Sequence, residues 1–160
     1  MISSATQRQI AQEFLAARGI VRLAELREEG VTAATISRME RAGEVLRLAR
    51  GLYQLPDAPL EAHHSLAEAA KRVPKGVVCL VSALAFHGLT DQMPKHVWIA
   101  IGQKDWAPST AGPRMQIVRF SDRHLITSVE TQVIEGVLVK VFGVAKTVAD
   151  CFRHRNKIGL

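Results

Sequence analysis

The spacing of apolar residues changes at Gly43, and this change constrains the fold of the first third of the chain more than any other feature. Upstream, apolar residues recur every three or four positions in residues 4–19, 21–29 and 33–42, which is the spacing of amphipathic helices. Downstream, two short apolar runs flank Ala49-Arg50-Gly51, a pattern that predicts a β-hairpin. Residues 30–32 form a short glycine-containing connection, as in a helix-turn-helix. We therefore predict a winged helix-turn-helix over residues 1–55, opened by a capping box of Ser4 and Gln7.

The third predicted helix has two different sides. At 100° per residue, Ile36 and Met39 fall on one side, which must face the first two helices. The opposite side is small, polar and basic, and nothing bulky keeps it out of a DNA groove. An arginine can donate paired hydrogen bonds to guanine or bind phosphate, and a serine hydroxyl can contact either the backbone or a base edge.

The predicted hairpin adds further cations, with Arg50 at its tip. A wing in this position would place them over an adjacent phosphate backbone. The residues predicted to bind DNA are therefore Thr32, Ala34, Ser37, Arg38, Arg41, Arg47 and Arg50.

The positive net charge of the chain fits an acidic partner, but the excess of basic side chains is spread over both parts of the chain. The 160 residues carry a formal net charge of +6. Residues 1–55 hold eight of the basic and six of the acidic side chains, so most of the excess lies in the second part. We expect a single copy of the first part to bind DNA weakly, with affinity depending on a correctly placed surface or on dimerisation.

The stiff segment 56–59, Pro-Asp-Ala-Pro, marks a domain boundary. Beyond it, residues 60–160 read as an α+β domain whose sheet is mostly antiparallel, and we expect few contacts between it and residues 1–55. The predicted elements are helices at 60–73 and 82–88, an apolar run at 77–81 that is either a strand or the front of the second helix, strands at 97–101, 115–120, 129–134 and 137–142, and a closing helix at 144–155 that packs Val148, Ala149 and Phe152 inward.

Enzyme chemistry is not expected. Transfer of a nucleotidyl group needs paired acids that hold two metal ions, whereas Asp91, Asp105, Asp122 and Asp150 are scattered along the chain. The pair Cys151 and His154 lacks further evident metal ligands, so we expect no catalytic residues, no metal and no cofactor. The two cysteines fit a reducing cytoplasm, and neither a signal peptide nor a membrane span is evident.

Several segments, in this order, resemble the AbiEi family of antitoxins of type IV toxin–antitoxin systems. They are residues 45–53 (VLRLARGLY), 82–89 (SALAFHGL), 97–101 (VWIAI), and the closing stretch from 129 through IEGV at 134–137 to AKTVADCF at 145–152. The likeness covers nearly the whole chain. Members usually continue past a segment like 155–160 into further helix, so the resemblance implies that this chain is either a shortened or a naturally short member.

The resemblance implies a function in phage defence. It implies a winged helix that represses its own operon at inverted repeats in double-stranded DNA. It further implies a second domain that counters a nucleotidyltransferase-like toxin without forming a stable complex with it.

Three questions stay open. A winged-helix regulator that senses a small ligand through its second part, with no toxin involved, would explain the same pattern. Trp106, in the loop 102–113, either folds back as an apolar anchor of its own loop or contacts a partner. The cations of the second part, Lys71, Arg72, Lys75, Lys95, Arg114, Arg119 and Arg123, form either a patch that faces nucleic acid or a solvated face.

Overall fold

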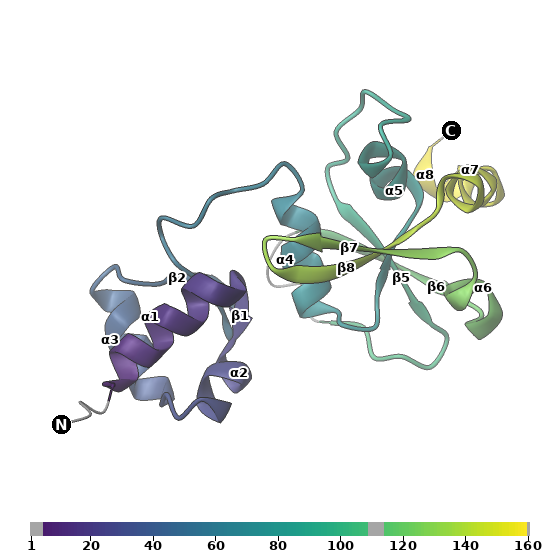
Figure 1. Cartoon of the computed structure of the whole chain (residues 1–160). Helices are drawn as coiled ribbons and strands as arrows, with labels where there is room; N and C mark the ends of the chain where they lie inside the picture. Colours follow the sequence, from purple (N-terminus) through teal and green to yellow (C-terminus); the bar gives the residue numbers. More distant parts are fainter. Residues whose placement is uncertain (1–4, 109–113, 160) are drawn as a thin grey trace.

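The computed structural model describes residues 5–108 and 114–159, which form two α/β parts joined by the segment around residue 60 (Figure 1). The elements of the first part are α1 (Gln7–Arg18), β1 (Val21–Arg22), α2 (Leu23–Glu28), α3 (Ala33–Arg41), β2 (Leu46–Ala49) and β3 (Leu52–Gln54). Its three strands pair antiparallel in the order β1-β3-β2. The mixed α and β composition and the predicted hairpin are confirmed.

One apolar core holds the first part together. It is built by all three helices and the sheet, from Ala11, Leu15, Val21, Leu26, Val31, Ile36, Met39, Val45 and Tyr53. Two sequence expectations are wrong in detail. Val21 lies in β1 rather than in the second helix. The capping box of α1 is formed by Thr6 and Gln9, with Gln7 already the first helical residue, while Ser4 lies outside the described residues.

The second part contains a five-stranded sheet in the order β6-β5-β4-β8-β7. Its strands are β4 (Val77–Val78), β5 (Val97–Gly102), β6 (Met115–Phe120), β7 (Val129–Ile134) and β8 (Val137–Phe142). Its helices are α4 (His64–Arg72), α5 (Leu80–Phe86), α6 (Asp122–Ile126), α7 (Val144–Arg153) and α8 (Arg155–Ile158). Helix α4 covers one face of the sheet, and α5 and α7 cover the other (Figure 1).

The sheet is mixed, so the expectation of a mostly antiparallel sheet is wrong. Strand β4 pairs antiparallel with β5, as β7 does with β8, whereas β4 pairs parallel with β8 and β5 pairs parallel with β6. The reason lies in the apolar run 77–81. It divides between a two-residue strand in the middle of the sheet and the start of α5, with Leu80 at φ 50° between them.

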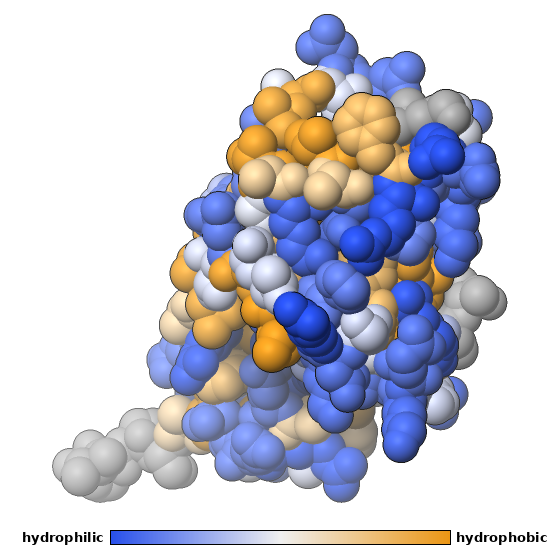
Figure 2. Space-filling model, turned by 90° about the vertical axis from the view of Figure 1, so that its right-hand side faces the viewer, coloured by the Kyte–Doolittle hydropathy of each residue, from blue (hydrophilic) through white to orange (hydrophobic). Residues whose placement is uncertain are grey.

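Two helices also differ from their expected faces. Helix α4 begins at His64 rather than at residue 60, and Leu60 is 72% exposed. On α7 the buried residues are Thr147, Asp150 and Cys151. The residues expected inside, Val148, Ala149 and Phe152, are instead exposed. Figure 2 shows the apolar side chains that gather on this side of the molecule, where α7 lies.

The inward face of α7 is polar because two of the helix's own residues form a buried ion pair there. Lys146 Nζ lies 2.8 Å from Asp150 Oδ2. The same ammonium stands over the rings of Phe142 and Phe120, at 4.5 and 5.1 Å from their centroids. Such cation–π contacts favour a charged group that is removed from water. The helix therefore buries a charge pair where its apolar residues predicted a hydrophobic seam.

The two parts touch extensively, contrary to the expectation of few contacts. Ile20 and Leu52 of the first part share one apolar cluster with residues of the second, among them Leu66, Val73 and Val137. At the other end of this interface, the Arg22 guanidinium donates to the Lys71 carbonyl oxygen, and Lys71 Nζ lies 2.9 Å from Glu25 Oε1. The position of the domain boundary at 56–59 stays a prediction.

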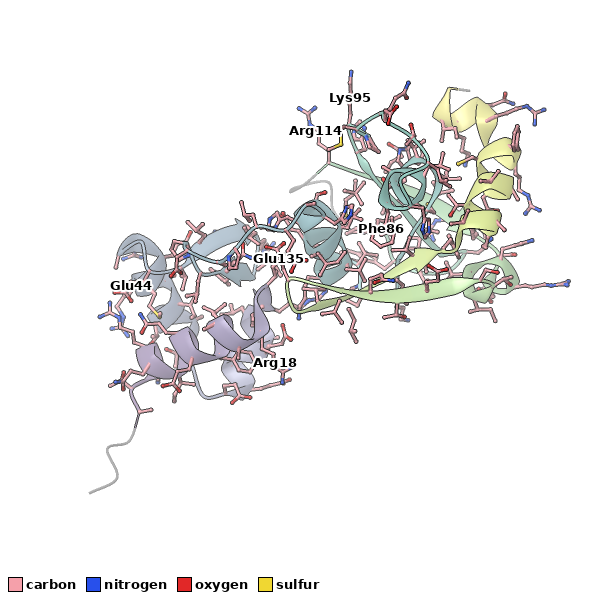
Figure 3. All side chains as sticks on the ribbon, turned by 45° about the horizontal axis from the view of Figure 1, so that its top comes forward. Arg18, Glu44, Phe86, Lys95, Arg114 and Glu135 are labelled. Atoms are coloured by element: carbon pink, nitrogen blue, oxygen red, sulfur yellow. The ribbon has the colours of Figure 1, made fainter. Side chains whose placement is uncertain are left out.

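The β7–β8 turn carries a second set of contacts between the parts. Figure 3 shows Arg18, at the end of α1, beside the turn that holds Glu135. Glu135 Oε1 accepts a hydrogen bond from Gln54 Nε2 at 3.2 Å, and Glu135 Oε2 lies 2.6 Å from His64 Nδ1. A Cβ added to Gly136 would lie 2.2 Å from the Arg18 carbonyl oxygen. Only a glycine lets the two backbones approach this closely.

Candidate nucleic-acid interface

The N-terminus of α3 is fixed to α1 by a polar cluster. Thr32 is the N-cap of α3, and its side chain accepts the Thr35 N–H. The side-chain oxygen of Gln7 accepts from Thr32 N at 3.1 Å and from Thr35 Oγ1 at 2.7 Å. Thr35 is buried while Gln7 and Thr32 are exposed, so the hydrogen bond from Thr35 is the most shielded contact that ties the start of α3 to α1.

The two sides of α3 are as the sequence predicts. Ile36 and Met39 are fully buried. The residues that are exposed are Ala34, Ser37, Arg38 and Arg41, together with Thr32 at the N-cap. Arg38 Nη2 lies 3.3 Å from Thr35 Oγ1, so this guanidinium is turned toward the N-terminal end of the helix. The outer side of α3 thus presents small, hydroxyl and guanidinium groups on a helix whose other side is locked into the core.

The hairpin holds the remaining two predicted residues, Arg47 and Arg50, both of them exposed. The pairing of β2 with β3 shifts register between Arg47 and Ala49, and Arg47 Nε donates to the Ala49 carbonyl at 3.4 Å. Such a bulge twists the strand and redirects its side chains. Tyr53 of β3 packs in the same core as Ile36 and Met39, so the hairpin and α3 belong to one packed unit. The role of these seven residues in DNA binding stays a prediction.

Sequence reasoning missed a groove beside α3. About 540 Å³ of open space lies between the first turns of α1 and α3, lined by Thr6, Gln7, Arg8, Thr32, Thr35, Arg38 and Met39. Arg8 Nε lies 2.9 Å from Glu44 Oε2, so its charge is partly balanced. The polar residues at the start of α1 were available as a signal, but their relation to α3 depends on how the two helices cross.

The acids and thiols of the second part lie in different environments. Asp105 and Asp122 both approach the backbone of Gly102, where Asp105 Oδ2 accepts the Gly102 N–H at 2.8 Å, so these two are less scattered than expected. Burial raises the pKa of the Cys151 thiol to about 11, and the nearby Asp150 adds to the shift. In residues 5–108 and 114–159, no three His, Cys, Asp or Glu side chains are grouped to hold a metal ion.

Membrane insertion of a helix is not indicated either. Among the described residues, every helix is too short or too polar to cross a bilayer.

Comparison with known protein families identifies the first part of the chain. Residues 8–56 match the family described as transcriptional regulator, AbiEi antitoxin. The matched range begins in α1 and ends just after β3, so it contains every residue that we predict to bind DNA. The resemblance to antitoxin regulators is confirmed over residues 8–56. No curated protein matches the chain.

Proposed function

From the family match of residues 8–56, we propose that the chain is a winged-helix DNA-binding antitoxin that represses its own toxin–antitoxin operon. The observation that carries the proposal is the outer side of α3, where Ser37, Arg38 and Arg41 are exposed opposite the buried Ile36 and Met39. The element order α1-β1-α2-α3-β2-β3, with the three strands in one small sheet, supports the assignment of the fold as a winged helix.

In this proposal, α3 enters the major groove. Arg38 and Arg41 can each donate a fork of two hydrogen bonds to the O6 and N7 atoms of guanine, which discriminates one base pair from the others. Arg47 and Arg50 of the hairpin contact phosphates and set the register without reading sequence. The cluster of Gln7, Thr32 and Thr35 holds the reading helix at a fixed angle, so that little conformational entropy is lost on binding.

Two copies on an inverted repeat would supply the affinity that one copy lacks. The acidic residues of the first part, Glu28 and Glu29 among them, offset much of its positive charge. A small net charge gives weak nonspecific attraction to DNA, and symmetric half-sites then favour a symmetric pair of proteins.

The antitoxin activity is assigned to the second part. The proposed counterpart is a nucleotidyltransferase-like toxin of a type IV system, countered in the cytoplasm without a stable complex, in a phage-defence role. The support for these points is the family match of the first part together with the segments of the second part that resemble the same family.

A reporter assay tests the proposal. The promoter region upstream of the chain's own gene is fused to a reporter, and the chain is supplied from a second plasmid. We expect repression by the wild type and loss of repression by Arg38→Ala and Arg41→Ala, at equal protein levels. Lys157→Ala, which removes an exposed cation far along the chain, is the control and keeps repression. Equal repression by all four proteins would contradict the proposal.

The antitoxin activity needs its own test, with the neighbouring gene as the toxin. Expression of that gene should stop growth, and co-expression of the chain should restore it. The Arg41→Ala variant should still restore growth when both genes are driven by foreign promoters, because neutralisation is assigned to the second part. Failure of the wild type to restore growth would contradict the antitoxin role while leaving repression untouched.

One observation favours a ligand-sensing regulator as the second candidate. A cavity of about 350 Å³ lies where the two parts meet, lined among others by Leu15, Gly19, Gln54 and Glu135. A small molecule in this cavity would contact both parts of the chain at once. A neighbouring metabolic or transporter gene, with operator affinity that changes in the presence of its substrate, would support this candidate over the antitoxin.

A further inference from the structure

Trp106 is the most exposed large aromatic side chain among the described residues, at 81% of its surface. The idea that it anchors its own loop is therefore wrong, since an anchor would be buried. Solvent exposure of an indole is unfavourable, and aromatic side chains that remain exposed are enriched where a partner binds. Among the described residues, little covers Trp106, so its indole is available to a partner.

The backbone leading to Trp106 is held firmly. Arg119 Nη1 donates to the carbonyl oxygens of Gly102, Gln103 and Asp105, at 2.9, 3.1 and 2.7 Å. Asp105 Oδ2 accepts the Gly102 N–H in addition. One guanidinium and one carboxylate therefore brace the four residues before Trp106. A braced aromatic loses little freedom when a ligand stacks on it, which favours binding.

Two hollows meet at Trp106. The larger, about 510 Å³, is a groove between the β2–β3 turn of the first part and the end of α4 in the second. Its polar lining consists of Arg22, Arg50, Lys71 and Arg72, with Trp106 and Pro108 at its border. The smaller, about 260 Å³, continues past Trp106 toward Lys75 and Ile101. We call the larger one the basic groove.

The lining of the basic groove is cationic. Among the described residues, no Asp or Glu contributes to it. Lys71 is balanced by Glu25 at 2.9 Å, and the Arg22 guanidinium donates to the Lys71 carbonyl, so these two serve the structure. Arg50 is exposed and Arg72 lines the groove, while Lys75 Nζ in the smaller hollow lies 4.0 Å from Asp105 Oδ1. A polyanion would be attracted along this path.

We propose that the basic groove binds single-stranded nucleic acid, with an unpaired base stacked on Trp106 and a neighbouring phosphate contacted by Arg50. An exposed aromatic beside a positively charged groove is the arrangement that proteins use to bind single strands, because every unpaired base offers a flat face for stacking. A duplex buries its base faces in its own stack and would leave the indole without a partner. The groove joins both parts of the chain, so it exists only while they are docked.

Binding to this groove is separable from the proposed reading of duplex DNA. Trp106 and Arg72 belong to the groove alone, Arg41 belongs to α3 alone, and Arg50 is common to both surfaces. Since one guanidinium cannot serve two strands at once, single-stranded and operator DNA should compete for Arg50.

Fluorescence anisotropy of labelled 15-nucleotide oligomers with the full chain tests this proposal. The probes are oligo-dT, oligo-rU, and an abasic DNA backbone of the same length. We expect Trp106→Ala to weaken binding of oligo-dT or oligo-rU by about 5- to 150-fold, the loss of one stacked base. Trp106→Phe should retain most of the affinity. The abasic probe should bind wild type and Trp106→Ala equally, because it has no base to stack.

Phe152→Ala is the matched control, since it removes another exposed aromatic, 66% exposed, from α7 outside the groove. It should leave affinity unchanged. Preference for dT or rU shows whether the natural strand is DNA or RNA. Equal affinity of wild type and Trp106→Ala for the base-containing probes, or an equal loss in Phe152→Ala, would overturn the proposal. If Arg41→Ala loses operator binding and keeps oligomer binding, the two surfaces are distinct; loss of both in Arg41→Ala would also overturn it.

Discussion

The contact between Gly136 and the end of α1 predicts that one methyl group there will loosen the junction between the two parts. Gly136 has φ +77°, and an added Cβ would lie 2.2 Å from the Arg18 carbonyl oxygen and 2.9 Å from the Arg18 carbonyl carbon. Both neighbours are backbone atoms and cannot rotate away. Gly136→Ala should therefore push the β7–β8 turn away from α1. Gly88→Ala is the matched control, because Gly88 has φ +69° and a Cβ there would meet nothing within 4 Å.

The expected magnitudes follow from these two environments. A left-handed backbone costs an alanine about 1–2 kcal/mol, and both variants bear this cost. Gly136→Ala additionally exposes part of the apolar contact made by Ile20 and Leu52, which are 0% and 2% exposed. Complete exposure of two such side chains costs roughly 3–6 kcal/mol, which sets the ceiling of the extra loss. We expect an excess of at least about 1 kcal/mol over the control.

Urea denaturation of both variants measures this difference, and limited proteolysis locates it. Cleavage between residues 55 and 63 should become faster in Gly136→Ala and stay unchanged in Gly88→Ala. Equal free energies of unfolding for the two variants, with equal cleavage, would refute the idea that close backbone contact holds the parts together.

Three further predictions concern two charged side chains and the absence of catalysis. Partial burial alone would raise the pKa of Glu25, but the hydrogen bond from the Arg22 N–H and the nearby Lys71 ammonium outweigh this effect and lower the pKa below 4.5. The stability that wild type holds over Glu25→Gln should therefore be complete at neutral pH and disappear as the pH falls through the lowered pKa. Urea titrations at several pH values will measure this difference. Asp150→Asn should lower the free energy of unfolding by about 3–5 kcal/mol, because it leaves the buried Lys146 ammonium without its counter-charge, and thermal denaturation will measure it. The purified chain with magnesium and nucleotides should transfer no nucleotidyl group to RNA or protein; transfer that Asp91→Ala or Asp150→Ala abolishes would contradict the absence of catalysis.

The features that the sequence predicted correctly depend on the spacing of residues that are close together in the chain. The outer side of α3 was predictable because Ile36 and Met39 are three residues apart and define the buried side of a single helix. The β7–β8 hairpin was predictable because Glu135 and Gly136 separate two apolar runs, and both residues have positive φ, 48° and 77°.

What the sequence did not predict depends on partners that are distant in the chain. Val78 pairs with Val141 in a parallel register, and nothing within a two-residue strand specifies that neighbour. The inward side of α7 contradicts its apolar pattern because Lys146 finds Asp150 and two aromatic rings there. The basic groove likewise arises only when the β2–β3 turn meets α4 and Trp106 across the junction.

The central claim is that α3 reads the bases of DNA and that the hairpin contacts the DNA backbone. Its most direct test is a titration of the promoter duplex and a scrambled duplex at several salt concentrations. Arg38→Ala or Arg41→Ala should cost about 1–3 kcal/mol on the promoter and erase its advantage over the scrambled duplex. Arg50→Ala should weaken both duplexes alike and flatten the slope of log affinity against log salt by about 0.9, with selectivity kept. Unchanged promoter affinity and selectivity in both α3 variants would contradict the claim.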